Sequence, residues 1–153
     1  MRMLTDIAKF LRSAKRCLRS GELSREPLQL LRVEWKGDRV DCDWLMRPVD
    51  PWDKCLPPHL AAENQTLQAL RDALKLREII FRSFPAVGLA HLRMFRAGKG
   101  HQLELVMTGS VNRWDEEFHR VPSVMMRAKM CGFRFKVAEE SMRGLVLISL
   151  QRA

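Results

Sequence analysis

The cysteine and histidine side chains are this chain's first candidates for nucleophilic catalysis or metal binding. Four of each are present, and Cys55 and His59 are close enough in sequence to meet across one helical turn. Trp52 precedes them in a proline-rich loop over residues 48–59, so the three define a candidate site for a small molecule or a reaction. A Cys near a His arises often by chance in a chain of this length, and the sequence favours a loop thiol and a surface His.

The spacing of potential ligands argues against a metal or a nucleotide. Structural zinc sites contain two Cys close together in sequence, whereas Cys42 and Cys55 are separated by twelve residues. Residues 98–100 have the sequence Gly-Lys-Gly, but their glycines lack the spacing of a phosphate-binding loop. We therefore predict neither a metal nor a cofactor.

Basic side chains offer another kind of chemistry, the binding of anions. The chain carries 27 Lys and Arg against 18 Asp and Glu, a net charge of +9, and this attracts acidic proteins and nucleic acid. Near the N-terminus four of them fall at intervals of three and four residues, which places them on one helical face. This basic stripe consists of Lys9, Arg12, Arg16 and Arg19. A solvated outer face without a partner would show the same pattern.

A second candidate surface is the polar face of the predicted sheet. Alternation along the strands places six residues there: Arg32, His91, Arg93, Phe95, Arg134 and Lys136. Basic side chains beside an exposed aromatic ring suit single-stranded nucleic acid. Against this, the same face carries four acidic residues: Glu34, Asp41, Asp43 and Glu104.

Three helices are predicted around these residues. The first spans about 4–20, with Thr5 or Asp6 capping its start and Gly21 its end. Its apolar face is predicted from the repeat of Leu4, Ile7, Leu11, Ala14 and Leu18. The second helix spans about 61–83, and a short third helix runs from Pro122 to Cys131 with Gly132 as its cap.

Three hairpins complete the predicted elements. The first, over 28–47, turns at Gly37-Asp38, which sets Trp35 opposite Val40 and Leu31 opposite Trp44 on one apolar face. The second, over 90–108, is predicted to turn at Gly98-Lys99, with Met94 opposite Leu103 and Arg93 opposite Glu104. The third pairs 133–137 with 145–150.

The sequence thus predicts one α+β domain over residues 1–153. Its single antiparallel sheet has about six strands from the three hairpins, and the helices pack mainly on one face. The last strand is apolar on both faces, which predicts contact with a second copy through Val146, Ile148 and Leu150.

No apolar run is long enough to span a membrane, and neither a secretory signal nor a disulfide framework is evident. We expect a cytoplasmic protein, although the basic amphipathic N-terminal segment also has the composition of a mitochondrial targeting peptide. The functional hypothesis is a non-enzymatic binding or regulatory domain whose basic helix meets an acidic partner. The alternatives are a nucleic-acid-binding protein and a small-molecule-binding or enzymatic domain that uses the loop over 48–59.

Overall fold

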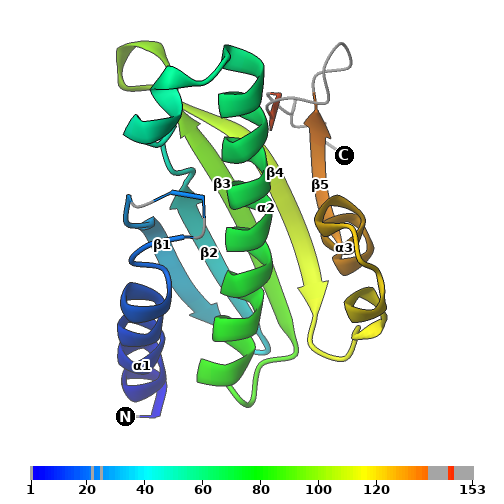
Figure 1. The fold of residues 1–153 in the computed structure, drawn as a ribbon. Coiled ribbons are helices and arrows are strands. Elements are labelled where there is room, and N and C mark those ends of the chain that lie inside the picture. The colour runs from blue at the N-terminus through cyan, green and yellow to red at the C-terminus, as the bar shows by residue number, and fades with distance from the viewer. Residues whose placement is uncertain (1, 22, 25, 138–144, 147–153) are drawn as a thin grey trace.

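A computed structural model describes residues 2–21, 23–24, 26–137 and 145–146. Within these residues the fold is α+β, with three α-helices and one mixed sheet (Figure 1). In chain order the elements are α1 (Arg2–Cys17), β1 (Gln29–Lys36), β2 (Arg39–Leu45), η1 (Pro51–Cys55), α2 (Pro58–Ser83), β3 (Leu89–Ala97), η2 (Lys99–His101), β4 (Leu103–Asn112), η3 (Glu117–Arg120), α3 (Val124–Cys131), β5 (Phe133–Val137) and β6 (Leu145–Val146). The main strands lie side by side in the order β1-β2-β3-β4-β5, and the two-residue β6 pairs with the end of β5.

The sheet is mixed, which corrects the expectation of a fully antiparallel one. Strands β2 and β3 are parallel, whereas the other neighbours are antiparallel. The reason is α2, a helix of 26 residues that carries the chain back along the sheet before β3 begins. A crossover of this length is what parallel neighbours require, and two hairpins flank it.

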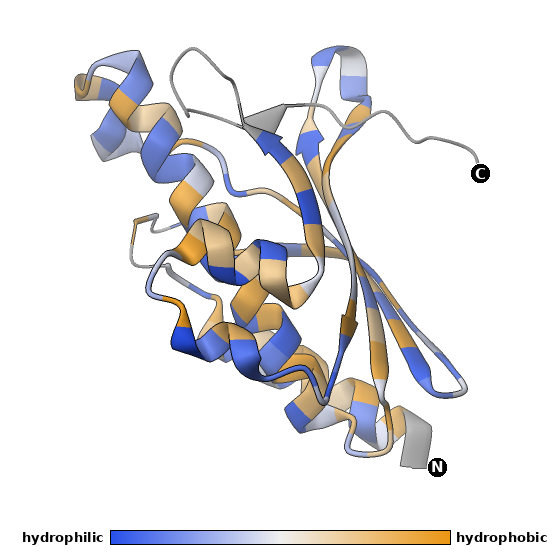
Figure 2. Ribbon diagram, turned by 90° about the vertical axis from the view of Figure 1, so that its right-hand side faces the viewer, coloured by the Kyte–Doolittle hydropathy of each residue, from blue (hydrophilic) through white to orange (hydrophobic). Residues whose placement is uncertain are grey.

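The three helices lie on one side of the sheet, and no described helix covers the other side (Figure 2). The covered face presents fully buried side chains from the central strands, among them Val40, Trp44, Leu92 and Met94. Helix α2 contributes the largest share of the helical side of the core, including Leu70, Leu76, Ile79 and Ile80. Burial of these residues supplies the main driving force for folding.

The apolar face of α1 differs from the predicted one. Phe10, Ala14 and Leu18 are buried in the core, whereas Leu4 and Leu11 are 71% and 44% exposed. The prediction is confirmed at Ala14 and Leu18 and wrong at Leu4 and Leu11, because α1 has more apolar positions than one face can bury. The aromatic ring of Phe10 takes the interior place, with its centroid 5.7 Å from that of another core phenylalanine.

The ends of α1 also differ from the prediction, since the helix begins before Thr5 and ends at Cys17. Gly21 is therefore not a helix cap but lies in the linker that leads to β1. A Cβ at Gly21 would lie 2.2 Å from the side-chain Nε2 of Gln68, so the glycine permits a close approach of the linker to α2.

The register of the first hairpin is confirmed except at its open end. Trp35 faces Val40 as predicted. A bulge between Leu30 and Arg32 shifts the pairing of the residues before it by one position, so Leu30 faces Trp44. Leu31, predicted to be buried there, is 38% exposed. Such a bulge inserts one residue that has no partner across the strand pair.

The predicted two-residue turn of the second hairpin is wrong. Residues 98–102 form a longer connection in which Gly100 has a φ of 67°. This connection and a bulge between Met94 and Phe95 together make Met107, and not Leu103, the partner of Met94. Both methionines are buried in the core.

The predictions for the last third are confirmed in part. Helix α3 begins after Ser123, whose side chain accepts a hydrogen bond from the Met126 N–H, so Pro122 is not its first residue. Gly132 ends it with a φ of 113°, as expected of a left-handed cap. The predicted contact surface of Val146, Ile148 and Leu150 lies outside the described residues and side chains, and self-association stays a prediction.

One buried ion pair joins α2 to the segment that follows β2. Arg47 donates from Nε and Nη2 to the two carboxylate oxygens of Asp72, at 2.8 and 3.1 Å. The same guanidinium donates to the backbone carbonyls of Leu18, at 3.0 Å, and Glu26. Gln68 donates a further hydrogen bond to Asp72, at 2.9 Å. Both charges are thus buried with extensive hydrogen bonding, as a stable internal ion pair requires.

Replacing Arg47 by Met is expected to lower the free energy of unfolding by about 3–5 kcal/mol, because Asp72 would remain buried without its counter-charge. Urea denaturation measures this change. The control is Arg82→Met, which breaks the exposed pair between Arg82 and Glu78 and should cost less than about 1 kcal/mol. Equal losses for the two variants would contradict the role given to Arg47.

Candidate functional site

A groove runs beside α1, where the helix and the linker after it meet the first strand. Its volume is about 1130 Å³. Leu11 and Leu18 contribute apolar surface from the α1 side, and Leu28 and Leu30 contribute it from the β1 side. A hydrogen bond from the Leu28 N–H to the Leu18 carbonyl, at 3.1 Å, holds the two walls together.

The basic stripe forms one rim of this groove. Its members Lys9, Arg12, Arg16 and Arg19 are all exposed, as the sequence predicts. The last three line the groove, and Lys15, which the stripe did not include, joins them. Among the residues that the structure describes, none of these five cations forms an ion pair. The groove therefore combines an apolar floor with positive charge that is available to a ligand.

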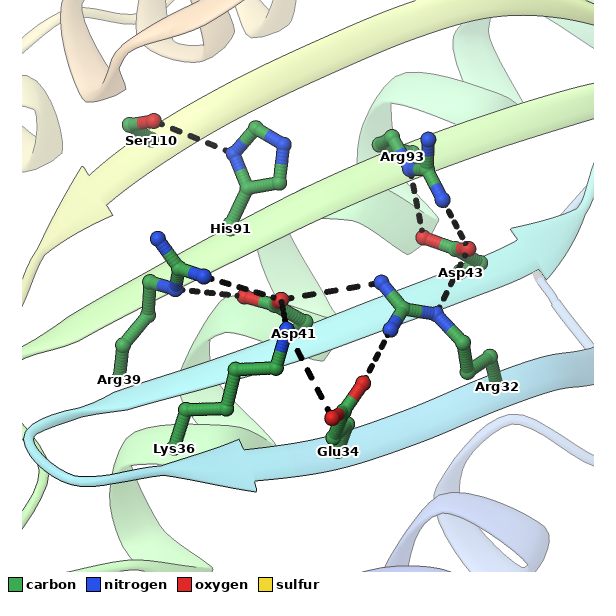
Figure 3. Close-up of polar contacts among 9 residues, drawn as sticks. All are labelled: Arg32, Glu34, Lys36, Arg39, Asp41, Asp43, His91, Arg93 and Ser110. Carbon is green, nitrogen blue, oxygen red and sulfur yellow. Dashed lines mark hydrogen bonds and ion pairs between the residues drawn. The ribbon is translucent and has the colours of Figure 1, made fainter.

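The uncovered face of the sheet carries a network of charged side chains (Figure 3). Asp43 lies at its centre and is 6% exposed. Arg93 donates to both of its carboxylate oxygens, at 2.9 and 2.6 Å, and Arg32 donates to one of them at 3.2 Å. Burial tends to raise the pKa of Asp43, but these hydrogen bonds outweigh it and hold the pKa below its usual value.

Asp41 occupies the neighbouring position and is 3% exposed. Arg39 Nε lies 2.8 Å from Asp41 Oδ1 in an ion pair, although that oxygen accepts no hydrogen bond. Arg32 and Lys36 each have a nitrogen 3.7 Å from the other carboxylate oxygen. The two aspartates thus lie beneath longer basic side chains, and the cations form the outer layer of this face.

The six predicted sheet-face residues come only partly together. Arg32 and Arg93 meet at Asp43, and the pairing Arg93 to Thr108 to Arg134 continues the same row across the sheet. Arg93 also packs over the ring of Phe95, 5.3 Å from its centroid. The remaining two differ: His91 contacts Ser110 at 3.2 Å, and Lys136 is exposed on β5.

The prediction that Glu104 faces Arg93 is wrong. The shifted register sets Glu104 opposite Arg96, which pairs with it at 2.8 Å. Arg93 therefore pairs with Asp43 and not with Glu104. The cations at the centre of this face are paired with carboxylates and do not form a row of independent charges.

The residues of the loop candidate lie on the surface. Trp52, Cys55 and His59 are all exposed, Trp52 by 73%. In the part of the chain that the structure describes, no hydrogen bond joins Cys55 to His59. Burial raises the pKa of Cys42 far above its usual value and that of Cys131 to about 11, so neither of these thiols is activated.

Two further absences hold for the described residues. No group of three or more His, Cys, Asp or Glu is placed to bind a metal ion. No helix within those residues has the length and apolar character needed to cross a membrane.

Comparison with protein-family models, curated proteins and solved structures finds no match to this chain.

Sequence reasoning missed Arg47 and the groove. A single Arg before a proline gives no local signal, because its partners lie at distant positions along the chain. The groove had a partial signal, since the excess apolar residue Leu11 lies one residue from Arg12 and four from Lys15. An apolar position beside a basic stripe is the pattern that could have indicated it.

Replacing Asp43 by Asn should lower the free energy of unfolding by about 1–3 kcal/mol at neutral pH, because charge-assisted hydrogen bonds are lost. Since the folded pKa of Asp43 lies below its unfolded value, this stabilisation is present above about pH 5 and is lost as the pH falls below about 4. Denaturation curves of wild type and variant across this pH range measure the difference. Glu34→Gln, a change at a more exposed carboxylate of the same face, is the control. A difference that grows on acidification would contradict the argument.

Proposed function

We propose that this chain is a non-enzymatic binding module that receives an acidic, amphipathic helix of a partner protein in the groove between α1 and β1. The observation that carries the proposal is one groove with an apolar floor and a basic rim whose cations form no ion pair with any residue that the structure describes. Amphipathic helices bind grooves of this kind through apolar residues on one face.

The two parts of the groove have different tasks. An exposed ion pair contributes only about 0–1 kcal/mol, so the basic rim alone would bind weakly. Apolar contact with Leu11, Leu28 and Leu30 supplies the larger part of the affinity. The rim at Arg12 and Arg16 then selects acidic segments and speeds their association.

A helix suits this groove better than an added strand. Strand β1 lies at the edge of the sheet and would be the template for an added strand. Its bulge between Leu30 and Arg32 interrupts the regular pattern at the end next to the groove. Proteins commonly block strand addition with such a bulge.

Nucleic acid is the weaker candidate for both surfaces. On the sheet face, three carboxylates, those of Glu34, Asp41 and Asp43, already engage the cations around them. In the groove, the apolar floor offers nothing to a phosphate backbone. Binding dominated by phosphates would weaken log-linearly with rising salt, whereas a mainly apolar interface would not.

A fluorescent synthetic peptide of about 16 residues, matched to the length of α1, provides the test. It carries Leu at helical spacings of three and four and Glu at the flanking positions. We expect it to bind the wild type more tightly than a scrambled peptide of the same composition. The double variant Arg12→Glu/Arg16→Glu should weaken binding at least about tenfold, since attraction becomes repulsion. Fluorescence anisotropy measures both.

The matched control is Lys54→Glu/Lys99→Glu, which alters the net charge equally at exposed residues of η1 and η2. Equal weakening by the two double variants, or equal binding of the scrambled peptide, would count against the groove. Tighter binding of single-stranded poly(U), with a steep salt dependence, would favour the nucleic-acid alternative.

A further inference from the structure

A second crevice, separate from the groove beside α1, lies between α2 and the segment that forms η3 and α3. Its volume is about 620 Å³, within the range of small-molecule sites. Six of its lining residues are Arg or Lys and two are Glu, so the lining carries a net charge of +4 with His119 neutral. The crevice is therefore strongly cationic although it lies between packed elements.

Several of these cations already have partners. Arg77 is 5% exposed and donates to the carbonyls of Asn112 and Asp115, both at 2.9 Å. Glu78 pairs with both Lys75 and Arg82. The other glutamate, Glu116, has a carboxylate oxygen 2.7 Å from the Nε2 of His119. Both glutamates of the crevice therefore already have a partner.

Arg127 of α3 is different, because no hydrogen bond or ion pair reaches its guanidinium from the residues that the structure describes. It is only partly exposed, and its Nε is buried without a partner. The Nε of Arg77, which lines the same crevice, is also buried and has no hydrogen-bond partner among the described residues. Half-buried charge without a counter-charge is unfavourable, and the positive charges of Arg71 and Lys75 increase the cost.

Arg71, Lys75 and Arg127 lie at a junction of two crevices. All three also line an adjoining crevice of about 400 Å³ that extends towards the end of α1. Two residues come from α2 and one from α3, so the three cations approach one opening from opposite sides.

From this arrangement we propose that the crevice between α2 and α3 binds the phosphate group of a small phosphorylated molecule. A phosphate monoester carries close to two negative charges at neutral pH, and three cations around one opening favour it over a carboxylate. The planar guanidinium of Arg127 can hold two of its oxygens, and the Lys75 ammonium can meet another. Leu74 provides an apolar wall for the remainder of the ligand.

The test uses the full chain with inorganic pyrophosphate as probe and ionic strength held constant with NaCl. At a concentration ten times the dissociation constant, bound pyrophosphate should raise Tm by about 4 °C. Arg127→Gln should abolish this rise. The same variant should match or exceed the wild-type Tm without the anion, because the uncompensated charge is removed. Arg134→Gln, an equal charge change on exposed β5, should respond as the wild type does.

Isothermal titration calorimetry with Lys75→Gln provides a second measurement that does not depend on the folding of the Arg127 variant. Lys75 is 41% exposed at its side chain, and its loss should weaken pyrophosphate binding several-fold. A wild-type Tm that pyrophosphate does not raise, or a rise that survives Arg127→Gln, would overturn the assignment. A larger rise with single-stranded RNA at equal phosphate concentration, also abolished by Arg127→Gln, would replace it with a nucleic-acid site.

Discussion

The buried guanidinium of Arg47 is the interaction on which the arrangement of α1, α2 and the first strands depends. It joins Asp72 of α2 to the carbonyl of Leu18 at the end of α1 and to the carbonyl of Glu26 in the linker. Leu18 and Leu28, on either side of this linker, form opposite walls of the groove. The shape of the proposed binding surface is therefore fixed by a polar contact beneath it, while the apolar residues supply the contact area.

The distribution of charge separates the surfaces of the molecule into two kinds. On the uncovered sheet face the carboxylates of Asp41 and Asp43 lie beneath basic side chains, and the charges compensate each other. Among the described residues, the cations of the basic stripe on α1 form no ion pair, and Arg127 in the crevice beside α3 has no counter-charge. From this uneven distribution we expect acidic ligands to bind at the helical layer and not at the sheet.

The sequence predicted the local structure better than the long-range arrangement. The turn at Gly37-Asp38 determined the adjoining register, because a two-residue hairpin allows few alternatives. The predicted register of the second hairpin was wrong, because its five-residue connection has no comparable constraint. Strand order was not encoded in any local pattern, although the long helix between β2 and β3 was a signal for parallel neighbours.

The candidate site was predictable to the same limited extent. Exposure of the basic stripe followed from helical periodicity. Periodicity did not reveal that Phe10 would displace Leu11 from the core and leave it beside the stripe. The most direct test of the groove is to follow backbone amide chemical shifts while the acidic amphipathic peptide is added. We expect the largest changes at residues 11–19 and 28–30. Changes concentrated at residues 41–43 and 91–93 of the sheet face would contradict it.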